Sequence, residues 1–145
     1  MIRINCDGFM SKDVKFARLV GVRREQGGEL MELPFSDNIQ NHIGNMHASA
    51  QFALAEISSG DFMRRRFSGL EGKVLAVVRN AEIKYSKPVR GALKAHAEID
   101  DEDESRFLQQ LEASGRAKLA VQVRLVSENG EAATTAVYHW FVTKL

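Results

Sequence analysis

The sequence has 145 residues, of which 44% are hydrophobic and 27% are charged, and its net charge is +1. This length and composition predict one globular domain, residues 1–145, with a hydrophobic core of its own. The near-zero charge gives no reason to expect nucleic acid or a membrane surface as a partner.

A single cysteine, Cys6, excludes an internal disulfide and fits a reducing compartment. No apolar run approaches the ~20 residues that a membrane span needs. The N-terminal residues also lack the apolar stretch of a signal peptide. We therefore expect a cytoplasmic protein.

The N-terminal part of the chain predicts a β-hairpin. Residues 1–12 are mixed in character and predict a short helix or turn. Residues 14–24 mix apolar and basic side chains, and the pair Gly27-Gly28 is a turn signal before the returning strand at residues 29–35. Pro34 near the end of that strand places the hairpin near a sheet edge.

The central segment predicts one long buried helix after a polar loop at residues 36–44. The helix is expected to start near Asn45 or Met46, with Asn45 as N-cap, and to end between residues 66 and 69. Residues 48–57 are apolar nearly all round, which is typical of a buried helix. Residues 61–67 are amphipathic and are expected to emerge into water.

The second half of the chain alternates with the period of β-strands. Strands are predicted at residues 73–86, 92–99, 116–127 and 132–143, with Leu75, Val77, Ala81, Ile83 and Tyr85 sharing one face of the first of these. The acidic run 100–104 leads into a short helix at 105–113, and Asn129-Gly130 marks a hairpin turn. We predict an α+β fold in which a curved antiparallel sheet of about six strands wraps the central helix.

The candidate catalytic residues are the polar residues at the start of this helix and Glu56 within it. A buried carboxylate costs on the order of 2–7 kcal/mol unless it is paired or used. The motif Asn41-x5-His47-Ala48-x7-Glu56 resembles the hotdog-fold acyl-CoA thioesterases of the phenylacetyl-CoA thioesterase type, and residues 87–93 are similar to that family's Pro-x-x-Gly turn. The resemblance spans roughly residues 13–145 and is closest to a poorly characterised thioesterase branch. Ala48 stands where the family usually has glycine.

The resemblance implies a hotdog fold and thioester hydrolysis in a homodimer or dimer of dimers with the site shared between subunits. Backbone N–H groups at a helix N-terminus are oriented toward negative charge, so the Ala48 N–H with a neighbouring amide would form an oxyanion hole. Glu56, from the opposite subunit, would act as general base or nucleophile. Asn41 and His47 complete the predicted catalytic set. No metal or cofactor is expected, and coenzyme A is part of the substrate.

The predicted substrate-binding residues surround this motif. They are Gly44, Ser49, Phe52, Arg64, Tyr85, Lys87 and Arg90. The arginine run 64–66 suits either the phosphates of coenzyme A or a solvated helix end.

Structural roles compete with these catalytic assignments. Glu56 would then be a buried carboxylate bonded within the chain, His47 a residue that only packs or hydrogen-bonds, and Asn41 a residue that shapes its loop. Two other functions also remain open, namely a non-catalytic acyl-CoA-binding module and an enoyl hydratase or dehydratase.

Overall fold

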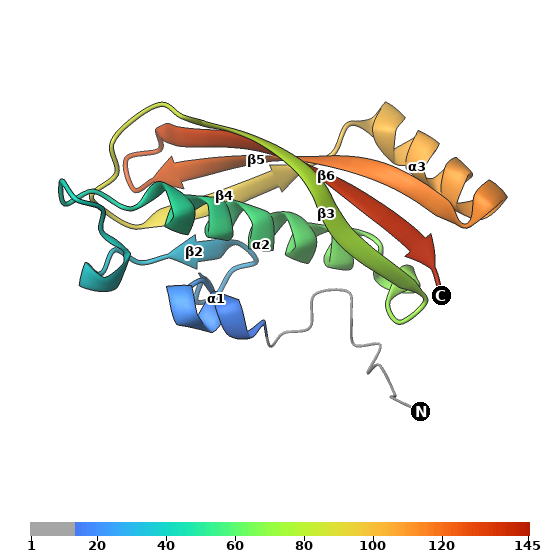
Figure 1. Cartoon of the computed structure of the whole chain (residues 1–145), viewed down its shortest axis with the longest axis horizontal. Helices are drawn as coiled ribbons and strands as arrows, with labels where there is room; N and C mark the ends of the chain where they lie inside the picture. Colours follow the sequence, from blue (N-terminus) through green and yellow to red (C-terminus); the bar gives the residue numbers. More distant parts are fainter. Residues whose placement is uncertain (1–13) are drawn as a thin grey trace.

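The computed structural model describes residues 14–145. Its sheet has six antiparallel strands in the order β1-β2-β4-β5-β6-β3, which confirms the predicted α+β architecture (Figure 1). The strands are β1 (Arg23–Arg24), β2 (Met31–Leu33), β3 (Val74–Tyr85), β4 (Leu93–Glu98), β5 (Arg116–Ser127) and β6 (Ala132–Lys144). Residues 1–12, for which a short helix or turn was expected, lie outside the described residues, and so does Cys6.

The sheet curves around the long helix α2 (Ala48–Arg66) (Figure 1). This helix packs against β2, β4, β5 and β6, and its Leu54, Ala55 and Met63 are fully buried. The other helices are α1 (Lys15–Val20), α3 (Asp101–Ser114) and the short 3-10 turns η1 (Asp37–Ile39) and η2 (Ser68–Leu70). The central helix is therefore the element around which the core is built.

Polar groups inside the core are satisfied by hydrogen bonds. Gln51 of α2 donates to the carbonyl of Met46 at 3.2 Å and accepts from the hydroxyl of Thr134. The indole of Trp140 donates to Ser59 Oγ at 3.0 Å. Because an unpaired buried polar group is costly, these bonds explain how polar residues are tolerated on the helix face that meets β6.

One row of α2 is left uncovered by the sheet. Ala48, Phe52 and Glu56 follow one another at a spacing of four and are exposed or half-buried, whereas most of their helical neighbours are buried. The row lies next to two tyrosines, since Tyr85 donates to the carbonyl of Ala48 at 3.0 Å and Tyr138 to that of Phe52 at 2.9 Å. Tyr85 is the last residue of β3, which is an edge strand.

The strand β3 does not keep one face throughout, contrary to the prediction. Its pairing with β6 shifts register between Val78 and Asn80, as in a β-bulge. An extra residue reverses the alternation of side chains, so Leu75 and Val77 point outward with 46% and 44% of their surface exposed, while Ile83 points inward. The predicted shared face of residues 75, 77, 81, 83 and 85 is therefore wrong.

The N-terminal prediction is confirmed only in part. Residues 14–24 were expected to form the first arm of the hairpin, but most of them form α1, which ends at Gly21 with φ of +100°. Val14, Ala17 and Val20 recur at a spacing of three, so α1 can turn them toward the core, whereas Phe16 and Leu19 are exposed. Only Arg23 and Arg24 pair with β2, across the turn that contains Gly27.

The ends of two helices also differ from the prediction. The N-cap of α2 is His47, and the predicted cap Asn45 instead accepts a hydrogen bond from Arg90 Nε at 2.8 Å. The helix α3 begins at Asp101, so the acidic run forms its first turn, where the helix dipole favours negative charge.

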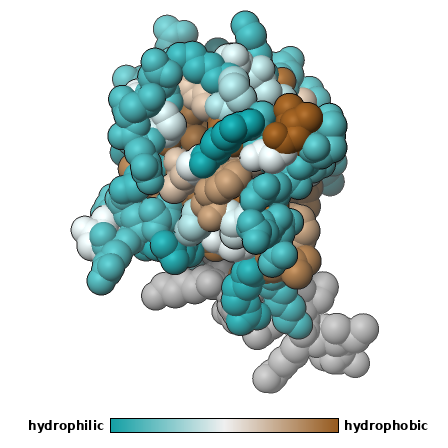
Figure 2. Space-filling model, turned by 90° about the vertical axis from the view of Figure 1, so that its left-hand side faces the viewer, coloured by the Kyte–Doolittle hydropathy of each residue, from teal (hydrophilic) through white to brown (hydrophobic). Residues whose placement is uncertain are grey.

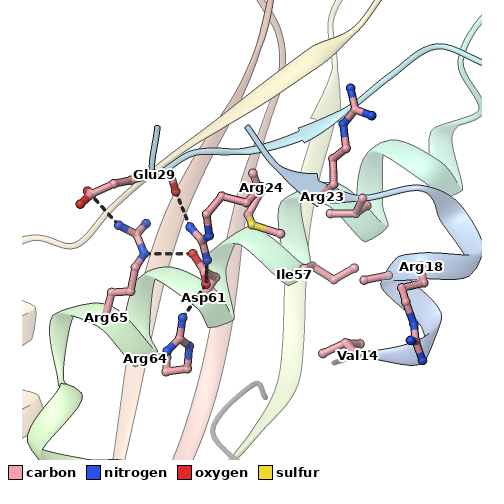
Figure 3. Close-up of a pocket in the computed structure, with 12 residues that line it drawn as sticks. Val14, Arg18, Arg23, Arg24, Glu29, Ile57, Asp61, Arg64 and Arg65 are labelled. Carbon is pink, nitrogen blue, oxygen red and sulfur yellow. Dashed lines mark hydrogen bonds and ion pairs between the residues drawn. The ribbon is translucent and has the colours of Figure 1, made fainter. Parts of the chain in front are cut away.

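The second half of α2 does not simply emerge into water. The Asp61 carboxylate is 8% exposed and accepts from Arg24 at 2.6 Å, Arg64 at 3.2 Å and Arg65 at 3.0 Å (Figure 3). Burial alone would raise the pKa of Asp61, but the hydrogen bonds and charges of the arginines, led by Arg24, hold it below its ordinary value of 3.8. This cluster, here called the Asp61 cluster, ties the N-terminal hairpin to α2.

Replacing Asp61 tests the contribution of this cluster. We expect Asp61→Asn to lower the free energy of unfolding at pH 7 by about 2–3 kcal/mol, less than for a fully buried pair because Arg24 and Arg65 are partly exposed. A carboxylate with a lowered pKa stabilises the fold above its unfolded-state pKa and loses that effect as the pH falls through its folded-state pKa. The difference between variant and wild type should therefore shrink in acid.

Urea unfolding at several pH values measures this difference. The matched control is Asp103→Asn, which breaks the exposed pair with Arg106 and should cost less than about 1 kcal/mol. Equal effects of the two substitutions would show that the Asp61 cluster contributes no more than a surface ion pair.

Candidate active site

A cleft of about 310 Å³ opens at the start of α2. Its walls come from the loop before the helix, the first turns of α2, and the turn that follows β3. It brings together four of the predicted site residues, namely Asn41, Ala48, Tyr85 and Lys87. Figure 2 views this end of the molecule and shows apolar residues surrounded by a mostly hydrophilic surface.

The loop before α2 is closed by Asn41. Its Oδ1 accepts from the backbone N–H groups of Ile43 and Asn45, both at 3.0 Å, and Gly44 takes the left-handed conformation with φ of +79°. The loop is anchored to the turn after β3 by the Met46 N–H, which donates to the Val89 carbonyl at 2.7 Å. Asn41 thus shapes its loop through its oxygen, while its side-chain NH2 contacts no acceptor within residues 14–145.

The histidine at the helix start acts as its cap. His47 Nδ1 accepts from the Ser49 N–H at 2.9 Å, and the His47 carbonyl accepts from the N–H groups of Ala50 and Gln51. Of the first four amides of α2, only that of Ala48 has no acceptor among the described residues. This N–H lies at the positive end of the helix dipole and belongs to a residue that lines the cleft, so it can donate to an anionic oxygen.

Charged and phenolic groups border the cleft. The Tyr85 hydroxyl donates to the Ala48 carbonyl at 3.0 Å, and burial raises the pKa of Tyr85. Lys87 pairs with Glu131 at 2.9 Å. Arg90 does not line the cleft but holds Asn45 in the loop wall.

Glu56 lies outside the cleft of its own chain. It follows Ala48 by eight residues, which is ~12 Å along an α-helix. Within residues 14–145 its carboxylate has no hydrogen-bonding partner. The nearby Ser59 hydroxyl donates to the backbone carbonyl of Glu56 and not to its carboxylate. Burial without a compensating cation raises the pKa of Glu56. Burial and the negative charge of Glu56 in turn raise the pKa of Tyr138.

The other predicted binding residues are spread from the loop before α2 to the last turn of that helix. Ser49 is exposed, and Phe52 contacts Tyr138 edge to face, with ring centroids 5.3 Å apart. Arg64 belongs to the Asp61 cluster, and neither it nor Gly44 lines the cleft. Their contacts with substrate stay predictions.

Six residues that line the cleft were not among the predicted site residues, namely Asn45, Met46, Gln51, Ser86, Pro88 and Val89. Met46 and Val89 carry no polar side-chain group that would single them out, and Gln51 lies within the segment predicted to form a buried helix. Its position at the start of a buried helix was the available signal.

Two kinds of site are absent from the described part of the chain. Residues 14–145 contain no group of three histidine, cysteine or acidic side chains placed to hold a metal ion. The same residues contain no helix that is both long and apolar enough to span a membrane.

Comparison with known proteins identifies the fold. The structure is similar to the Pseudomonas aeruginosa protein PA5026, described as a probable thioesterase, with a TM-score of 0.78 at 20% identity over 100% of this chain and 97% of that one. The Bacillus halodurans protein BH2602, solved with CoA, gives a TM-score of 0.68 at 20% identity over 90% of this chain and 76% of that one.

A third similar structure is that of a mutant of the Pseudomonas aeruginosa thioesterase PA1618. Its TM-score is 0.69 at 18% identity, over 90% of this chain and 86% of that one. At such identities the likeness shows the fold alone, and that fold is the predicted hotdog fold.

The sequence itself gives one family match. No curated protein matches it. Residues 22–142 match the family described as a domain of unknown function, DUF4442. This match covers most of the chain, so the protein, which has the hotdog fold, belongs to the DUF4442 family.

Proposed function

We propose that the protein is a thioesterase that hydrolyses acyl-CoA or acyl-carrier thioesters as a homodimer. The observation that carries this proposal is that two residues lining the cleft, Ala48 and Asn41, each have a donor, the Ala48 N–H and the Asn41 side-chain NH2, that lacks an acceptor among residues 14–145. Two donors at one helix N-terminus suit an oxygen on which negative charge develops. The structural likeness to a probable thioesterase and to a protein solved with CoA supports the same reaction.

In the proposed reaction the thioester carbonyl oxygen accepts from Ala48 and Asn41. The Glu56 carboxylate takes a proton from a water molecule as the water oxygen forms a bond to the carbonyl carbon. The tetrahedral intermediate then expels the sulfur as a thiolate, which leaves readily and needs no strong acid. A nucleophilic Glu56 that forms an anhydride is the variant of this mechanism.

A second subunit would supply the carboxylate. In one chain Glu56 lies ~12 Å along α2 from Ala48, too far to act on a carbonyl held there. The edge strand β3 spans 12 residues and is paired on only one side within residues 14–145, and the row Ala48, Phe52 and Glu56 beside it is not covered. A second copy added along β3 would cover both features and bring Glu56 of the partner subunit toward this cleft.

The variant Glu56→Gln separates a catalytic from a structural role. We expect thiol release from acyl-CoA to fall roughly 10²–10⁴-fold, because the base is lost. The unfolding midpoint at pH 7 should stay the same or rise, since burial disfavours the ionised carboxylate and neutral glutamine removes that penalty. The control Glu71→Gln, at an exposed position, should change neither quantity.

Three results would count against these assignments. Full thiol release by Glu56→Gln would exclude Glu56 as the base. Saturable acyl-CoA binding without turnover by the wild type on any acyl-CoA would identify a binding module instead, and hydration of an enoyl-CoA without hydrolysis would identify a hydratase.

The pH dependence of catalysis gives an independent test. A general base must be ionised, so kcat/KM should rise with pH through an apparent pKa above the ordinary glutamate value of 4.5. The rise follows from the burial of Glu56 without a cation. A profile that is flat from pH 4.5 to 7, or that falls over this range, would contradict a carboxylate base with a raised pKa.

Mixing two inactive variants tests the shared site. Asn41→Asp keeps the oxygen that accepts from Ile43 and Asn45 but replaces the NH2 donor, and we expect a loss of roughly 10²–10³-fold. After random subunit exchange with Glu56→Gln, half of the dimers are mixed and each contains one intact site. Activity should therefore recover to about a quarter of the wild-type value.

In the control mixture, the double variant Asn41→Asp/Glu56→Gln takes the place of Glu56→Gln. No intact site can then form, so thioesterase activity should not recover. A mixture of the single variants that also stays inactive after verified subunit exchange would show that each chain uses its own Glu56.

A further inference from the structure

A second and larger cavity, of about 570 Å³, lies between α1, the β1–β2 hairpin and the C-terminal half of α2 (Figure 3). None of the residues that line it lines the cleft at the start of α2. Its volume is in the usual range for small-molecule pockets. We call it the arginine pocket, because Arg24, Arg64 and Arg65 form its wall together with Asp61 and Glu29.

One side of the arginine pocket is apolar. Ala17, Val22 and Ile57 line it and belong to the hydrophobic core, and Val14 and Met31 pack against that core. These residues come from α1 and the segments beside it, from β2 and from α2, so the apolar wall extends across three elements. A ligand that fills this space would need an apolar body.

The opposite side carries an excess of positive charge. Three guanidiniums, those of Arg24, Arg64 and Arg65, share the two carboxylates of Asp61 and Glu29. Arg23 also lines the pocket and is paired with Glu32 at 3.1 Å. Arg18 lines the pocket too, so five guanidiniums stand against the carboxylates of Asp61, Glu29 and Glu32, and the lining carries an excess of positive charge.

The same wall contains an unsatisfied donor. The Nε of Arg64 has less than 1 Å² of accessible surface and contacts no acceptor among residues 14–145, so a bound oxygen reaches it only when the guanidinium turns toward the pocket. A buried donor without a partner is disfavoured, and an anionic oxygen is the acceptor that a guanidinium binds best. Asp61 already shows that this group of arginines accommodates a carboxylate (Figure 3).

We propose that the arginine pocket binds an organic monocarboxylate with an apolar body, of the kind that a medium-chain fatty acid represents. The excess of positive charge suits a carboxylate, which a guanidinium can bind through two parallel hydrogen bonds. The apolar side accommodates the chain. This assignment does not rest on the proposed thioesterase activity, and it places Arg64 in a site separate from the cleft.

Calorimetric titration of the full chain with decanoate tests the proposal. We expect saturable binding, and we expect no binding of decanol, which lacks the carboxylate, or of acetate, which lacks the chain. Inorganic phosphate should not compete with decanoate. Absence of decanoate binding, or equal binding of decanol and decanoate, would overturn the proposal without any variant.

Two arginine variants locate the site. Arg64→Gln should weaken decanoate binding roughly tenfold to a hundredfold, the usual effect of losing a hydrogen bond to a charged group. The matched control Arg66→Gln changes the same residue type two positions on, where the side chain pairs with Glu104 outside the pocket, and should leave the affinity unchanged. Equal affinities of the two variants would overturn the proposal.

A third variant excludes the cleft. Tyr85→Phe alters the cleft and should leave decanoate binding as in the wild type. A loss of affinity in Tyr85→Phe as large as that in Arg64→Gln would place the acid in the cleft, and so overturn the proposal. Should Arg64→Gln fail to fold, the comparison of decanoate with decanol and the Tyr85→Phe result still decide it.

Discussion

The burial of α2 by a sheet that does not enclose it determines the rest of the structure. Four of the six strands pack against the helix, and the polar groups that face them, such as those of Gln51 and Ser59, are paired with Thr134 and Trp140. What remains is a single row that carries Glu56. A carboxylate on a covered face would need a partner, whereas on the uncovered row it stays half-buried and unpaired within residues 14–145.

The loop before α2 determines which amide at the start of the helix is left without an acceptor. Every helix begins with amides that lack intrahelical acceptors. Here His47 satisfies the amides of three of the residues that follow it, through its ring and its carbonyl, and leaves that of Ala48 without an acceptor in the described chain. Asn41, which lines the same cleft, holds the loop with its oxygen and leaves its NH2 without an acceptor in the described chain. The structural and chemical roles of these residues are therefore compatible and need not exclude each other.

The parts of this fold that local patterns encode could be predicted, and the parts that distant contacts decide could not. The alternation of β5 and the turn at Asn129-Gly130 specify a hairpin by themselves, and the motif spacing placed Asn41 and Ala48 together. The bulge near Val78 is invisible to a pattern with strict period two. The orientation of Arg64 depends on Asp61 and on Arg24, which lies 37 residues before Asp61 in the sequence.

The two ends of α2 suit groups of opposite charge, and Asp61 and Glu56 lie between these ends. Arginines suit the C-terminal end, where the helix dipole is negative, and anionic oxygens suit the N-terminal end. Glu56 lies only five residues before Asp61, within ~8 Å along the axis. Because Asp61 binds Arg24, Arg64 and Arg65, none of these cations is directed to Glu56, and burial is the cause that raises the pKa of Glu56. The Asp61 cluster thereby leaves an unpaired carboxylate with a raised pKa on the open row of the helix.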